Sequence, residues 1–131
     1  MKITGTFEVS MNPLDTGMSG AEGFQFARRS IDKVFKGELD ASSVGEMLSV
    51  VTCVQGSAGY VAMETVTGNL CGLDGSFVLQ HYGTMREGSQ LLVLEIVPDS
   101  GTDDLAGITG KMAIKMEDGQ HFYEFEYELP G

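Results

Sequence analysis

The sequence predicts an all-β fold: a single small, closed antiparallel β-barrel of about eight strands, occupying residues 1–131 as one domain. Two observations carry this prediction. Apolar and polar residues alternate along most of the chain, and short turns containing Gly or Asp separate the alternating runs. Eight antiparallel strands of about ten residues exceed what a flat open sheet sustains, and closing them into a barrel removes the exposed edges.

The first two predicted strands flank a long loop. Residues 3–11 alternate with their apolar members on one face, which is typical of a half-buried strand. Residues 12–23 are rich in Gly, Ser and Asp and form a loop long enough to be a lid or a barrel mouth. Residues 24–36 form the second strand, in which basic and apolar residues share one parity: Ala27, Arg29, Ile31, Lys33 and Phe35.

Residues 40–54 are the one segment in which two periodicities conflict. Apolar residues at helical spacing and a possible capping box of Ser43 and Glu46 favour a helix. Gly45 and the β-branched residues of Val50-Val51-Thr52 favour a strand that ends in a turn. We predict a strand, and the family resemblance given below decides this choice.

The rest of the chain consists of predicted hairpins. Gly72 to Gly75 join strands 60–71 and 76–86, a turn at Glu87-Gly88 precedes strand 90–97, and Asp118-Gly119 joins strands 111–117 and 121–129. In the last strand, aromatic residues alternate with acids that we expect to face solvent and not a metal: Glu124, Glu126 and Glu128.

Composition excludes several classes of partner. The formal net charge is −11, from 19 acidic and 8 basic residues, and such a charge repels nucleic acid and anionic membranes. The sequence has no signal-peptide pattern at Met1 and no apolar run long enough for a membrane helix, so we expect a soluble, cytoplasmic protein. A two-residue turn at Ser57-Ala58 would keep Cys53 far from Cys71, so both thiols are predicted to be free.

No standard catalytic, nucleotide-binding or metal-binding signature is present, and neither a metal nor a cofactor is predicted. The acids of the Val97–Gly110 crossing superficially resemble a calcium loop, but their spacing lacks its alternating ligands and terminal Glu. An exposed turn explains Asp99, Asp103 and Asp104 better.

One pair of residues is the main candidate for chemistry. A two-residue loop at Leu73-Asp74 would set Val66 opposite His81 and leave Glu64 as a diagonal neighbour on the same face. A carboxylate beside an imidazole suits a general acid/base or a ligand clamp, although a structural pair that only satisfies its own hydrogen bonds is the commoner case. If His81 faces outward instead, Gln80 and Tyr82 become the polar groups of the lumen.

Four further residues are candidates for ligand binding. Glu46 and Glu95 each alternate in step with apolar residues of their strand and would line a cavity if those residues point inward. Glu95 could face His81 only if the turn at Glu87-Gly88 spans three residues. Arg29 could anchor a ligand carboxylate inside the barrel or lie exposed on the outer wall. Tyr60 could donate a hydrogen bond at a barrel mouth or simply pack at the rim.

Four stretches resemble a bacterial family, the domain of unknown function 3224, in the family's order along nearly the whole chain: residues 4–9, 64–68, 75–83 and 100–110. Residues 104–110, reading DLAGITG, also resemble the corresponding loop of allene oxide cyclases and dirigent proteins. This resemblance implies an eight-stranded barrel with an apolar interior, frequent oligomerisation and cofactor-free chemistry. The catalytic residues of the cyclase do not match positions of this chain, so the resemblance implies no reaction.

These observations lead to one leading hypothesis and two alternatives. The leading hypothesis is a homodimeric barrel that binds a small, partly apolar ligand through His81 and Glu64. The first alternative is a cofactor-free isomerase, cyclase or lyase in which Glu64 positions His81 as the acid/base. The second is a filled barrel that associates with proteins through its outer wall.

Overall fold

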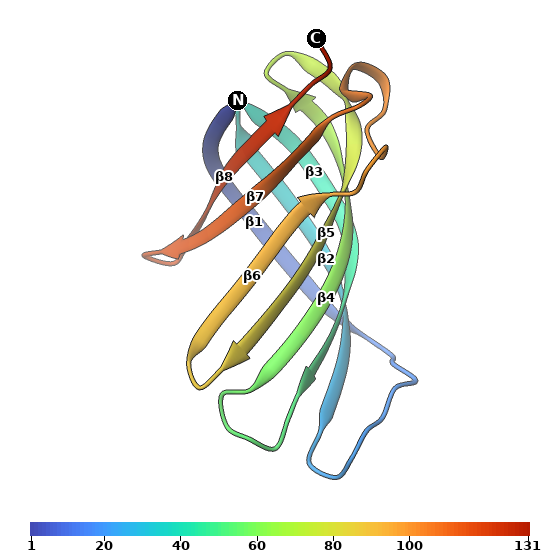
Figure 1. Cartoon of the computed structure of the whole chain (residues 1–131), viewed down its shortest axis with the longest axis vertical. Helices are drawn as coiled ribbons and strands as arrows, with labels where there is room; N and C mark the ends of the chain where they lie inside the picture. Colours follow the sequence, from blue (N-terminus) through green and yellow to red (C-terminus); the bar gives the residue numbers. More distant parts are fainter.

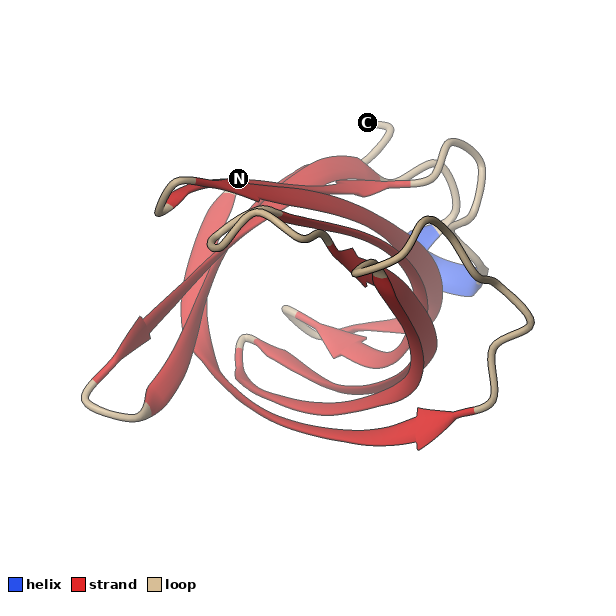
Figure 2. Cartoon of the chain, turned by 90° about the horizontal axis from the view of Figure 1, so that it is seen from below, coloured by secondary structure: helices blue, strands red, loops and turns tan.

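The computed structural model, which describes residues 1–131, is a closed barrel in which each strand pairs antiparallel with the next and β8 returns to β1 (Figures 1 and 2). The strands are, in order, β1 Lys2–Leu14, β2 Gln25–Gly37, β3 Leu39–Val51, β4 Ala58–Leu70, β5 Leu73–Arg86, β6 Ser89–Ile96, β7 Thr109–Glu117 and β8 Gln120–Glu128. The predicted fold class and strand number are therefore confirmed.

Alternation decides which side chains face the lumen. The pattern is clearest in β2, where Ile31, Lys33 and Phe35 are buried and the residues between them are exposed. The ambiguous segment around Gly45 is the strand β3, because its two neighbours β2 and β4 pair with it along nearly its whole length. Tertiary pairing thus overrides the helical spacing of its apolar residues.

Three of the connections are two-residue turns whose first residue has positive φ and whose second is glycine: Cys71-Gly72, Glu87-Gly88 and Asp118-Gly119. Positive φ at both central positions matches the right-handed twist of the flanking strands. The β4–β5 turn lies two residues earlier than predicted from Leu73-Asp74. The predicted turn at Ser57-Ala58 is also wrong, since β3 and β4 are joined by a six-residue loop, residues 52–57.

The segment between β6 and β7 serves as a partial strand. It contains the single short helix, η1 Asp103–Leu105, and it runs along the start of β5. The backbone amide of Ser76 donates to Thr102 Oγ1 at 3.0 Å, and that of Val78 donates to Ser100 Oγ at 3.0 Å. This segment therefore takes the place of β6 beside the first half of β5. No helix in the structure has the length and hydrophobicity needed to span a bilayer.

The barrel is filled at one end and hollow at the other. Towards the end that carries both termini, at the top of Figure 1, the lumen is packed with large apolar side chains, among them Leu39, Leu70, Phe77, Leu79, Phe125 and Tyr127. Towards the opposite end, where the loop 15–24 and the turns after β3, β5 and β7 lie, the inward side chains leave space. Figure 2 looks into the barrel from this lower mouth.

Candidate functional site

The candidate site is a cavity of about 590 Å³ in the lower half of the lumen. All eight strands contribute to its wall, and nine of its thirteen lining residues are apolar or aromatic: Phe7, Val9, Met11, Ile31, Met47, Tyr60, Leu92, Ile114 and Met116. Every one of them lies at an inward position of its strand. The cavity is thus the part of the lumen that inward side chains do not fill, and it has the size and lining of a small-molecule pocket.

The remaining lining residues are nitrogen-bearing: Lys33, His81, Gln90 and His121. Both histidines of the chain are among them. None of the 19 acidic residues lines the cavity.

At the inner end of this cavity, three charged or titratable side chains meet. Lys33 Nζ lies 2.9 Å from Glu64 Oε2, and His81 Nε2 lies 2.7 Å from the same oxygen. The lysine contact is a well-formed hydrogen bond, whereas the ring N–H of His81 is not well aligned with the oxygen. The side chains of Lys33, Glu64 and His81 are only 5%, 0% and 4% exposed. We call these three residues the lumen triad.

Strand register explains how the triad forms. Ala62 is the Cα partner of His81 and Leu79 is that of Glu64, so Glu64 is the diagonal neighbour of His81. The predicted register placed Val66 opposite His81. The error is four residues, and because an even shift keeps every side chain on its face, the predicted diagonal relation survives.

Gly45 on β3 provides the space for Glu64. The two residues are Cα partners, and a Cβ atom built on Gly45 would lie 2.7 Å from Glu64 Cβ and 2.1 Å from the carbonyl oxygen of Met63. Real Cβ atoms do not make such contacts. Gly45 therefore allows β3 and β4 to approach closely where the buried carboxylate enters the lumen.

The electrostatics of the triad follow from burial and from its neighbours. Burial by itself would raise the pKa of Glu64, but the contacts with His81 and Lys33 outweigh it, so the pKa of this carboxyl lies below its ordinary value. Burial, together with the negative charge of Glu64, raises the pKa of the Tyr60 phenol. Glu64 is therefore an anion at neutral pH, and Tyr60 is a neutral hydroxyl beside it.

Tyr60 completes the wall around His81. Their rings meet edge to face with centroids 6.4 Å apart, and Tyr60 lies opposite Gly83. Three buried polar atoms of this region have no well-formed hydrogen bond within the protein: Glu64 Oε1, Ser43 Oγ and His81 Nε2. The carboxylate of Glu64 therefore has one buried oxygen without a donor, out of reach of the cavity.

The structure places the other predicted site residues differently. Glu46 lies on the outer wall, where it pairs with Arg28, and Glu95 lies on the outer wall opposite Lys111, so the inward orientation expected for both is wrong. Their apolar neighbours along the strand, such as Val44, point outward with them. The prediction assumed that apolar residues point into the lumen, and these apolar residues lie on the outer wall instead. Arg29 shares the inward parity of Ile31 and is half-buried, but it does not line the cavity.

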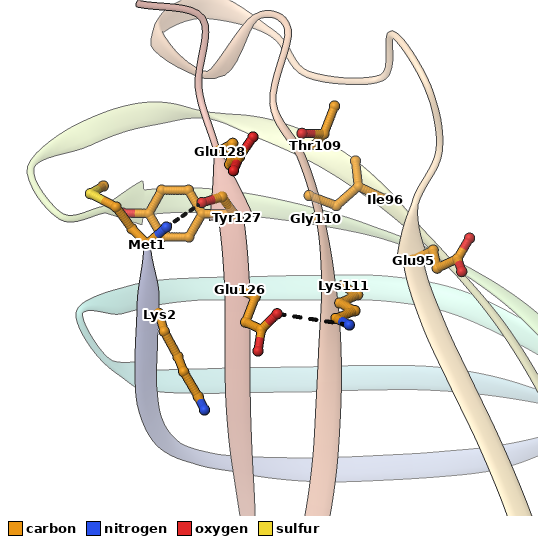
Figure 3. Close-up of a pocket in the computed structure, with 10 residues that line it drawn as sticks. All are labelled: Met1, Lys2, Glu95, Ile96, Thr109, Gly110, Lys111, Glu126, Tyr127 and Glu128. Carbon is orange, nitrogen blue, oxygen red and sulfur yellow. Dashed lines mark hydrogen bonds and ion pairs between the residues drawn. The ribbon is translucent and has the colours of Figure 1, made fainter.

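Gln80 and Tyr82, the alternative lumen set, face outward. Figure 3 shows the outer hollow that contains Glu95, towards the filled end of the barrel. Two of its charged groups already have partners, since Lys111 Nζ lies 3.8 Å from Glu126 Oε2 and the amino terminus donates to the carbonyl oxygen of Tyr127 at 2.8 Å. This hollow lacks the buried polar groups of the lumen cavity.

The structure contains no cluster of three His, Cys, Asp or Glu side chains with the geometry of a metal site. In the crossing after β6, Asp104 Oδ2 accepts a hydrogen bond from the backbone amide of Asp74 at 3.2 Å. Asp104 therefore helps to fix the segment on β5. Cys53 and Cys71 are both free, as predicted, and both are exposed.

Sequence reasoning missed three of the four polar residues of the cavity wall: Lys33, Gln90 and His121. Lys33 shares the buried parity of Ile31 and Phe35, and this pattern was visible in the sequence. His121 shares the parity of Tyr123 and Phe125, and its ring lies 5.0 Å from that of Phe7. A basic residue on the apolar face of a strand was the signal that selected Arg29, and Lys33 and His121 carry the same signal.

Comparison with known proteins agrees with this architecture. The model of the family described as protein of unknown function (DUF3224) matches residues 3–127. The chain belongs to the DUF3224 family. A crystal structure of a DUF3224 protein of unknown function from Shewanella oneidensis MR-1 is 51% identical to it, with a TM-score of 0.96, and the match covers 100% of this chain and 98% of that one. No curated protein matches this DUF3224 chain significantly.

Proposed function

We propose that this protein binds a small, partly apolar molecule in the lower half of its barrel. The observation that carries the proposal is the lumen cavity of about 590 Å³, with an apolar wall and a buried polar triad at its inner end. Apolar walls supply affinity and a few converging polar groups supply orientation, which is the usual construction of a ligand site.

The contrast between the two halves of the lumen supports this proposal over a filled barrel. One half is packed by residues such as Phe77 and Phe125, whose rings stack at 5.6 Å. The other half keeps open space beside the lumen triad. Burying an ion pair is a poor way to stabilise a fold, since apolar residues of similar volume frequently do as well or better. Buried charges beside a cavity are more typical of functional sites.

The test uses N-phenyl-1-naphthylamine, a neutral apolar fluorophore, and two matched substitutions. Ile114→Trp places a larger ring in the cavity, which has room for it, and Val61→Trp adds the same ring to the outer wall. We expect Ile114→Trp to weaken probe binding at least tenfold and Val61→Trp to leave it unchanged. Equal affinities in the two variants, or no binding to the wild type, would contradict a ligand site in the lumen.

One observation favours a second candidate function, a cofactor-free isomerase, cyclase or lyase. His81 lines the cavity while its Nε2 lies 2.7 Å from Glu64 Oε2, so a proton on Nε2 is favoured and Nδ1 is left as a base. Once a ligand has been recovered by native mass spectrometry of protein purified from its own host, His81→Gln separates the two functions. A binder keeps its affinity within about tenfold, whereas an enzyme loses turnover worth roughly 10² to 10⁴.

We also propose that the protein is a homodimer formed through its outer wall. Leu48, Val61, Tyr82 and Val93 are successive Cα partners across β3 to β6 and form an outward apolar row. Val61 is 55% exposed and Tyr82 is 47% exposed. Sedimentation of the wild type and of Val61→Lys tests this: a dimer that dissociates in the variant supports the proposal, and a monomeric wild type contradicts it.

The kinship with allene oxide cyclase barrels is likewise a proposal. The eight-stranded closed barrel and the Asp104–Gly110 crossing on β5 support it. It adds the expectation that the lumen is where ligands bind, but it names no reaction.

A further inference from the structure

The lumen cavity differs from the rest of the protein in the polar groups that its wall exposes. The chain carries a formal charge of −11, yet the cavity wall contains one lysine, both histidines and no acid. Because the chain has 19 acidic and only 8 basic residues, a wall of this size without an acid is unusual for this protein. The polar groups that face the cavity are thus nitrogen groups, and the charge of Lys33 is balanced by Glu64 behind the wall.

Lys33 has hydrogen-bonding capacity that the protein does not use. Its ammonium has three N–H donors. The only acceptor bonded to it is Glu64 Oε2, at 2.9 Å. The ammonium also lies 5.1 Å from the ring centroid of Phe7 and 5.8 Å from that of Phe35, which hold it in place without accepting a conventional hydrogen bond. Two N–H donors of a nearly buried cation thus remain for a ligand.

Glu64 does not compete for the ligand, because its side chain is fully buried and does not line the cavity. It lies behind Lys33 and His81 and contacts both of them through one oxygen. Glu64 is therefore a positioning residue: it fixes the nitrogen atoms of two neighbours at the cavity wall. His121, whose ring is tilted against that of Phe7, adds a further nitrogen group to the cavity wall.

We propose that the ligand is an anionic amphiphile, an apolar body carrying one acidic group such as a carboxylate or sulfonate. The acidic group contacts Lys33 and His81 at the inner end of the cavity, and the apolar body lies along Met11, Met47 and Met116. Methionine side chains adapt to apolar bodies of different shape. This inference deepens the proposed ligand-binding function and rests on it.

The test compares two probes with the same ring system, 1-anilinonaphthalene-8-sulfonate and N-phenyl-1-naphthylamine, which differ by one sulfonate. We expect the sulfonate probe to bind the wild type at least tenfold more tightly, because charge-assisted hydrogen bonds are the strong ones in a water-poor site. Equal or weaker binding of the sulfonate probe would overturn the anion preference and leave lumen binding intact. If Ile114→Trp affects neither probe, the proposed function itself fails.

A matched pair of double variants identifies the residues responsible. Lys33→Met/Glu64→Gln removes one positive and one negative charge, so the formal charge stays −11. It should reduce the preference for the sulfonate probe to about onefold. Lys111→Met/Glu126→Gln makes the same change at an exposed ion pair on the outer wall and should keep the preference. A preference that persists in the first variant would overturn the assignment to Lys33.

A second comparison needs no variant. Decanoate and decanol share a chain length, and each is titrated against N-phenyl-1-naphthylamine bound to the wild type. Decanoate should displace the probe at a concentration at least tenfold lower than decanol does. The reverse order would contradict the proposal.

Discussion

Breaking the lumen triad at Lys33 should be far more costly than breaking any surface pair of this protein. Lys33 Nζ and Glu64 Oε2 lie 2.9 Å apart, with side chains only 5% and 0% exposed. Removing one partner of such a pair leaves the other charge buried without compensation, which typically costs about 3–5 kcal/mol. We therefore expect Lys33→Met to lower the free energy of unfolding by about 4 kcal/mol.

Removing both partners should restore most of this loss. In Lys33→Met/Glu64→Gln no uncompensated charge remains, and the amide keeps the shape of the carboxyl, so we expect a free energy of unfolding within about 1 kcal/mol of the wild type. The control is Lys111→Met, whose pair with Glu126 is long, at 3.8 Å, and has side chains 70% and 47% exposed. It should change stability by less than about 1 kcal/mol.

The assay is urea denaturation at neutral pH, followed by far-ultraviolet circular dichroism and fitted by linear extrapolation. A native domain has about 5–15 kcal/mol of stability, so a loss of this size remains measurable. The reasoning is refuted if Lys33→Met costs no more than Lys111→Met. It is also refuted if the double variant is as unstable as the single one, because the loss would then not come from an unpaired Glu64.

Three further predictions concern pH, packing and thiols. The folded-state pKa of Glu64 lies below its unfolded value of about 4.3, so its contribution to stability is present above that pH and is lost as pH falls through the folded-state value. The free energy of unfolding should therefore fall less steeply with acid in Lys33→Met/Glu64→Gln than in the wild type. Identical profiles for the two proteins would contradict this. Gly45→Ala should lower the free energy of unfolding by about 3 kcal/mol, because its Cβ would lie 2.1 Å from Met63 O. Gly17→Ala, whose Cβ would have no atom within 4 Å, should leave stability unchanged. Equal costs would show that β3 and β4 do not approach so closely. Native protein should react with two equivalents of Ellman's reagent without reductant, since Cys53 and Cys71 are free and exposed, and a value near zero would indicate a disulfide.

The barrel could be predicted because its signals are local. Alternation and the Glu87-Gly88 and Asp118-Gly119 turns define strand order without any long-range information, and an up-and-down barrel needs little more. Register is harder, because Gly72 and Gly75 offer alternative positions for the turn after β4, and the structure uses Cys71-Gly72. The His81–Glu64 relation was still obtained, since it depends on parity.

The errors at Glu46 and Glu95 have one physical cause. Parity arguments assume that apolar residues point inward, but the outer wall of this barrel carries Val44, Val61 and Tyr82. When both faces of a strand are partly apolar, alternation no longer identifies the lumen. Lys33 was overlooked for a different reason. A lysine is rarely buried unless it is paired, and its partner Glu64 lies two strands away in the sequence.

Methyl NMR of the methionines tests the ligand-binding lumen most directly, since the chain carries eight Met residues distributed over both sides of the wall. Met11 and Met116 line the lumen cavity, and Met63 lies in the outer hollow beside Tyr82. On titration with 1-anilinonaphthalene-8-sulfonate, ring currents should shift the methyl signals of Met11 and Met116 and leave that of Met63 in place. Shifts confined to Met63 would place binding on the outer wall and contradict a ligand site in the lumen.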